Sequence, residues 1–184
     1  LAESGAATTA QFQIIDMVNP TAPAIVGTVS NTYITGAVTS LAVQGRYAYV
    51  GATSGGAGYI YAIDISDPTQ AVPSVASMNF GASSAATGLY AQGRTLYVAD
   101  GTANVLRSAD ISTPSTPVGI SGTSPTTGAA SAQALTGSGR YIYVVTSSNP
   151  TNTLQVFDMG GTYSQQVEAG GVETDTLSVR SNAN

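Results

Sequence analysis

The feature that most constrains this chain is an internal repeat of 46 to 48 residues. A phrase that starts with Gly-Arg and ends with Tyr-Val occurs three times, at 45–50, 93–98 and 139–144. A second phrase, which carries one aspartate, occurs four times. Its aspartates are Asp16, Asp64, Asp110 and Asp158, spaced 48, 46 and 48 residues apart. Because two independent anchors give the same period, the chain must be built from one structural unit used several times.

Each unit contains short β-type runs separated by turn residues. In the second unit these runs are 39–43, 47–51, 59–65 and 74–80, and no stretch shows helical periodicity. Four short antiparallel strands with a period near 46 residues are typical of a β-propeller blade. We therefore predict an all-β, propeller-like chain of about four blades, with repeat units at about 1–35, 36–84, 85–128 and 129–169. Residues 170–184 are expected to be a linker or an extra strand.

The strand chemistry agrees with stacked blades. Along Tyr47-Ala48-Tyr49-Val50 the tyrosines face one side and Ala48 and Val50 the other, and neither side is charged. The first Asp phrase has no Gly-Arg phrase before it, so the chain is expected to begin inside the third strand of a blade and to be a fragment of a larger protein.

A family resemblance follows from these phrases. The runs GRYAYV at 45–50 and YIYAIDISDP at 59–68 resemble the LVIVD-type repeat, which implies a propeller of a bacterial or archaeal surface or secreted protein. The resemblance extends over roughly residues 11–169, and the fourth copy departs from it after Asp158, where Pro is missing. The stretch 170–184 is similar to linkers that enter fibrous stalks of adhesin-like and phage-tail proteins.

Composition excludes several classes of function. The charged fraction is 8%, the net charge is −5, and the five basic residues are all Arg. Such a chain lacks the basic surface that nucleic acid or an anionic membrane requires, and no run is long enough for membrane insertion. With no His and no Cys, imidazole bases, thiol nucleophiles and the usual zinc sites are absent, and we expect no catalytic residue and no cofactor. A two-carboxylate hydrolase that uses Asp100 with a turn aspartate remains formally open.

The repeated polar residues have two interpretations each. The four repeat aspartates either bind Ca²⁺ or accept hydrogen bonds from the turn that follows them, and the local role is favoured. Asp64 and Asp67 are the one close acidic pair and the candidate metal residues. The repeated Arg residues either grip an anion or pair with nearby carboxylates. They are Arg46, Arg94 and Arg140.

Tyrosines supply the candidate ligand-binding residues. Those within the repeated phrases are expected to pack between blades. Tyr33, Tyr90 and Tyr163 lie outside the phrases and are the candidates for an exposed aromatic platform that binds a sugar.

These observations favour a non-catalytic binding or structural module that is extracellular or at the cell surface, such as part of an adhesin, a surface-layer protein or a tail fibre. Its partner would be a surface glycan or a protein. The alternative is part of a larger propeller enzyme whose active site lies in other blades. A third reading is a spacer that self-associates through its open edges.

Overall fold

The computed structural model describes residues 10–70, 72–120, 127–128, 130–147 and 153–159. Its strands form four antiparallel sheets, which we number I to IV. Sheet I contains β1 (Ala10–Asp16) and β2 (Ala24–Ser30). Sheet II contains β3 (Ala37–Gln44), β4 (Tyr47–Ser54), β5 (Ala57–Asp64) and β6 (Val72–Ala82). Sheet III contains β7 (Ala86–Gln92), β8 (Thr95–Asp100), β9 (Val105–Asp110) and β10 (Val118–Gly119). Sheet IV contains β11 (Ser131–Ser138), β12 (Tyr141–Ser147) and β13 (Thr153–Asp158).

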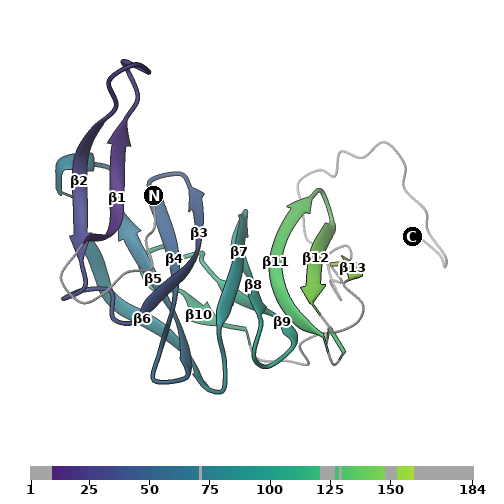
Figure 1. Cartoon of the computed structure of the whole chain (residues 1–184). Helices are drawn as coiled ribbons and strands as arrows, with labels where there is room; N and C mark the ends of the chain where they lie inside the picture. Colours follow the sequence, from purple (N-terminus) through teal and green to yellow (C-terminus); the bar gives the residue numbers. More distant parts are fainter. Residues whose placement is uncertain (1–9, 71, 121–126, 129, 148–152, 160–184) are drawn as a thin grey trace, which may run out of the picture.

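The four sheets stand beside one another in chain order, like an open fan with sheets I and IV at its ends (Figure 1). Strands that follow one another in the chain pair with each other, so every sheet is a meander. The 3₁₀ turn at Pro68–Gln70 leads out of β5. In the part of the chain that the structure describes, no helix has the length and apolar character of a membrane span. The all-β, propeller-like fold predicted from the repeat is confirmed.

The strand content differs between the sheets. Sheets II and III have four strands each. In sheet I, β1 ends at Asp16 just as β5 ends at Asp64, so the two strands of this sheet match the third and fourth strands of sheet II. In sheet IV, the described strands match the first three. Each sheet therefore follows the same order of strands as sheet II, although sheets I and IV show only part of it.

The Gly-Arg phrase makes the turn between the first two strands of a sheet. Gly45, Gly93 and Gly139 have φ values of 59°, 59° and 57°, which residues with a Cβ rarely adopt. This left-handed step closes the hairpin tightly and explains why glycine stands before each arginine.

The core lies between the sheets. In β4, Ala48 and Val50 pack against sheet I, while Tyr49, on the opposite face, packs against sheet III. All three side chains are at most 1% exposed. Alternate residues of β4 therefore belong to two cores, one shared with sheet I and one shared with sheet III. This agrees with the sequence, in which neither face of the strand carries a charge.

Neighbouring sheets are also joined by side-chain hydrogen bonds near the fan's inner strands. The register of β3 and of β7 shifts where Thr39 and Thr87 stand, which marks a β-bulge. The hydroxyl groups of these threonines donate to the carbonyl oxygens of Ala86 and Ala132 in the next sheet, each at 2.6 Å.

The glutamine side chains that end β3 and β7 repeat the same kind of bond. The Gln44 amide donates to the Gly93 carbonyl oxygen at 2.6 Å, and the Gln92 amide donates to the Gly139 carbonyl oxygen at 2.9 Å. Each sheet is thereby bonded to the Gly-Arg turn of the sheet that follows.

Candidate functional site

The Gly-Arg turn and the Asp phrase meet at the same end of each sheet. In sheet II, Arg46 Nη2 lies 2.5 Å from Asp64 Oδ2, and the Ser66 amide donates to Asp64 Oδ1 at 2.9 Å. The Ile65 amide also donates to the Arg46 carbonyl oxygen at 2.8 Å. The Arg46 guanidinium, together with the Ser66 hydrogen bonds, lowers the pKa of Asp64 to about 2. This arrangement, which we call the turn clasp, fixes the start of the connection to the fourth strand.

Sheet IV repeats the turn clasp. Arg140 pairs with Asp158, and the Met159 amide donates to the Arg140 carbonyl oxygen at 2.9 Å. In both clasps the guanidinium stacks on the tyrosine that follows the arginine, at 5.5 Å from the Tyr47 ring and 5.4 Å from the Tyr141 ring. The same guanidinium therefore contacts both the aromatic ring and the carboxylate.

Sheet III departs from this pattern at one residue, because Thr95 stands where the other two sheets have tyrosine. The described ion pairs include Arg46, Arg107 and Arg140, and Arg94 is not among them. The Ser112 amide still donates to Asp110 Oδ1 at 2.7 Å. The hydrogen bonds from Ser112, with a smaller contribution from the Arg94 charge, lower the pKa of Asp110. Asp110 thus lacks the close arginine that Asp64 and Asp158 have.

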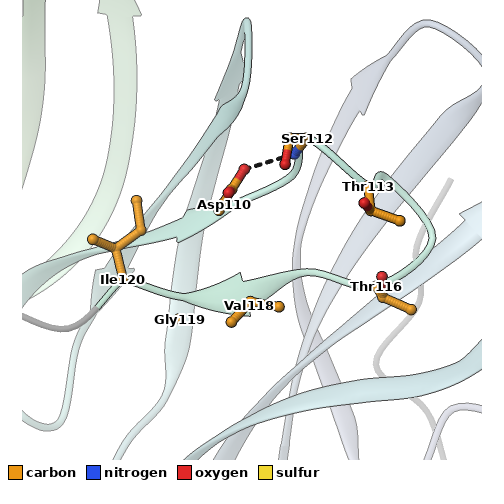
Figure 2. Close-up of a pocket in the computed structure, with 7 residues that line it drawn as sticks. All are labelled: Asp110, Ser112, Thr113, Thr116, Val118, Gly119 and Ile120. Atoms are coloured by element: carbon orange, nitrogen blue, oxygen red, sulfur yellow. Dashed lines mark hydrogen bonds between the residues drawn. The ribbon is translucent and has the colours of Figure 1, made fainter.

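An open depression of about 420 Å³ lies beside Asp110 (Figure 2). Its walls are formed by the end of β9, by β10 and by the loop that connects these two strands. Its lining consists of one carboxylate, three hydroxyl side chains, one glycine and two aliphatic side chains: Asp110, Ser112, Thr113, Thr116, Gly119, Val118 and Ile120. Val118 is 62% exposed and Ile120 is 50% exposed. The depression therefore offers hydrogen-bonding groups beside uncovered apolar surface.

The predicted metal pair has local partners. Asp67 Oδ1 accepts hydrogen bonds from the Thr69 amide at 2.9 Å and from the Thr69 hydroxyl at 2.7 Å, which lowers the pKa of Asp67. Asp64 is engaged by Arg46 and Ser66 as described above. No group of three or more metal-ligating carboxylates is found within the described ranges.

Three of the turn aspartates make the hydrogen bonds that the local interpretation describes. Asp16 Oδ1 accepts from the Val18 amide at 2.8 Å, as Asp64 and Asp110 accept from the second residue after each of them. The hydrogen bonds expected of a residue that begins a turn are present in all three.

Asp100 lies at the opposite end of sheet III from Asp110, since β8 and β9 pair Thr95 with Asp110 and Asp100 with Val105. It is 1% exposed. Its Oδ2 is 2.7 Å from Arg107 Nε, and its Oδ1 accepts hydrogen bonds from the Ala85 amide at 2.9 Å and from two amides of the turn that follows β8, those of Thr102 and Ala103. This geometry joins sheet III to the crossover from sheet II and separates Asp100 from the turn aspartates.

The candidate tyrosines lie in three different settings. Tyr33, in the crossover between sheets I and II, is 59% exposed. Tyr90 is half-buried on β7, where its ring stacks on Tyr97 with centroids 6.5 Å apart and lies over Gly137 of sheet IV. Tyr163 lies outside the described residues. The structure does not bring Tyr33 and Tyr90 to one surface, because Tyr33 lies in the crossover between sheets I and II and Tyr90 packs between sheets III and IV.

The lining of the depression was not predicted from the sequence, apart from Asp110. Its hydroxyl and aliphatic residues belong to a connection that carries no motif. The signal that was available is the substitution of Thr95 for tyrosine in the second copy of the Gly-Arg phrase.

Comparison with known proteins identifies the repeat. Residues 6–31, 35–74 and 85–121 match the LVIVD repeat, and together they make up more than half of the chain. The matched segments correspond to sheets I, II and III. No curated protein matches the chain in sequence. The repeat, the meander sheets and this match agree, and the chain belongs to the LVIVD repeat family, whose repeats build β-propellers.

Proposed function

We propose that this chain is a non-catalytic binding module of an extracellular or cell-surface protein, and that the depression beside Asp110 receives a surface glycan. The observation that carries the proposal is the departure of sheet III from the turn clasp. In sheets II and IV the repeat aspartate pairs with an arginine that stacks on a tyrosine. In sheet III, Asp110 instead lines the open depression.

The chemistry of the lining suits a polyhydroxylated ligand. A carboxylate oxygen accepts hydrogen bonds from sugar hydroxyls, and threonine hydroxyls can both donate to sugar hydroxyls and accept from them. The exposed Val118 and Ile120 side chains offer apolar surface to the C–H face of a sugar ring, and covering such a surface contributes binding free energy. The low content of charged side chains, 8%, agrees with recognition by hydrogen bonding rather than by long-range attraction.

The test is a glycan array probed with the full chain, with and without Ca²⁺. We expect selective binding that Asp110→Asn weakens by about tenfold or more, because the charged acceptor is lost. Asp64→Asn is the matched control, since Asp64 holds the same repeat position but is closed by Arg46. Ile120→Ser provides a second variant that leaves the carboxylate intact and should weaken binding as well.

Absence of glycan binding by the folded wild-type chain would refute the proposal. Equal losses in the Asp110 and Asp64 variants would also refute it, because they would locate the effect in the fold and not in the depression.

A further inference from the structure

The sheets at the two ends of the fan each have an uncovered apolar face. We call the side of a sheet that packs on the next sheet its forward face, and the side that packs on the preceding sheet its backward face. Inside the chain, a forward face always meets a backward face. The exposure of side chains at equivalent repeat positions shows which faces lack a neighbour.

The forward face of sheet IV is uncovered. Four residues before the repeat aspartate stand Ile60 in sheet II, Leu106 in sheet III and Leu154 in sheet IV. Ile60 is 0% exposed and Leu106 is 2% exposed, because each packs in the core shared with the next sheet. Leu154 is 64% exposed. The same repeat position therefore changes from core to surface where the fan ends.

The uncovered face extends beyond this leucine. Tyr141, Val145 and Val156 lie on the same side of β12 and β13, and they are 39%, 48% and 54% exposed. A shallow hollow of about 210 Å³ on this face is lined by Ala134, Leu135, Thr136, Tyr143, Val145 and Leu154. Apart from Thr136, these side chains are apolar or aromatic, as a blade-to-blade contact requires.

The backward face of sheet I is uncovered in the same way. Directly before the repeat aspartate stand Ile63 and Ala109, both 0% exposed because the preceding sheet covers them. Their equivalent in β1, Ile15, is 37% exposed. Ile25, which pairs with Ile15 across the sheet, is 57% exposed, and Met17 is 56% exposed.

We propose that the forward face of sheet IV docks on the backward face of sheet I of a second copy of this chain. Each copy carries both halves of the contact that already joins its own sheets, so the intermolecular contact continues the intramolecular one. Two copies contribute eight sheets, which lies within the four to eight blades of known propellers. Head-to-tail pairing of this kind buries different faces of the two partners.

The first measurement is the molar mass of the full chain by light scattering and sedimentation over a wide concentration range. We expect association, with a species of twice the 18.4 kDa chain mass. Val156→Glu on sheet IV and Ile25→Glu on sheet I should each weaken association by about tenfold or more, because each would bury an unpaired charge. Val43→Glu is the matched control, since Val43 is 56% exposed but lies on sheet II.

Mixing the two variants tests the direction of the contact. Val156→Glu chains keep an intact sheet I, and Ile25→Glu chains keep an intact sheet IV, so a mixture should associate more tightly than either variant alone. A monomer at every concentration would overturn the proposal and would mean that other segments of the same polypeptide cover these faces. Loss of association in the Val156 variant alone would also overturn it, because it would indicate pairing of like faces. An equal effect of the Val43 control would overturn it too.

Discussion

At the scale of single residues, one arginine and one aspartate of the repeat each take part in several interactions. In sheet II the Arg46 guanidinium contacts a carboxylate and an aromatic ring, and its carbonyl oxygen accepts the Ile65 amide. The Asp64 carboxylate in turn contacts that guanidinium and the next turn. A single exposed ion pair contributes little to stability, but this cluster fixes two connections relative to each other.

The turn clasp predicts a pH dependence. Because the pKa of Asp64 in the folded chain is lowered to about 2 from a usual 3.8, its stabilising effect is complete above the usual value and is lost as the pH falls toward 2. In Arg46→Gln the pKa of Asp64 should rise toward 3.8, although the Ser66 hydrogen bond remains. Carboxyl carbon chemical shifts followed during an NMR titration measure both values. The control, Arg94→Gln, should leave Asp64 unchanged, and an unshifted Asp64 in Arg46→Gln would contradict the prediction.

The role of Asp100 could not be read from the repeat. Asp64 and Asp110 recur with the period, whereas the equivalents of Asp100 are Ala52 and Thr146. A lone carboxylate in a sequence does not reveal whether a half-buried guanidinium and backbone amides surround it. The sequence left Asp100 open as a catalytic acid, and the structure places it in a bonded position between sheets II and III.

At the scale of strands and sheets, most of the fold could be predicted. The turn glycines mark where the second strand begins, and the repeat aspartates mark where the third strand ends. The expected run 47–51 accordingly lies within β4, and the run 59–65 nearly coincides with β5. The β-bulges at Thr39 and Thr87 could not be predicted, since a bulge interrupts the alternation from which strands are recognised.

Close approach of adjacent sheets predicts the effect of Gly88. A Cβ at this position would lie 2.9 Å from the Leu135 backbone nitrogen and 3.0 Å from the Ala134 Cα. Because backbone atoms cannot move aside as a flexible side chain can, Gly88→Ala should lower the free energy of unfolding by about 1–3 kcal/mol. Chemical denaturation measures the change.

The control for this substitution is Gly119→Ala, where the nearest atom to the added Cβ is the Met78 sulfur at 3.8 Å. This variant should be as stable as the wild-type chain or slightly more so, because alanine restricts the unfolded chain. Equal stability of the two variants would show that sheets III and IV are farther apart in solution.

At the scale of the whole molecule, the fan is an array in which the main contacts between the described sheets join neighbours in the chain order. Stability in such arrays is set by the units and by their nearest-neighbour contacts. Sheets II and III are covered on both faces, whereas sheets I and IV are covered on one. The inner sheets should therefore be the most stable part of the array.

Hydrogen exchange tests this ordering. In dilute solution the amides of β12 should exchange faster than those of β4, although both are second strands of their sheets, because Val145 is 48% exposed while its equivalent Gly51 is buried. Mass spectrometry of peptides from the two strands measures the difference. Uniform protection would mean that the array opens as one cooperative unit.

The bonds from the bulge threonines and the terminal glutamines have a consequence for how such arrays change in evolution. In each of them the side chain belongs to the earlier unit and the acceptor is a main-chain carbonyl of the later one. A main-chain acceptor is supplied by every unit, whatever its side chains. Duplication or deletion of a whole repeat therefore leaves these hydrogen bonds intact wherever the earlier unit has the threonine and the glutamine, as sheets II and III do.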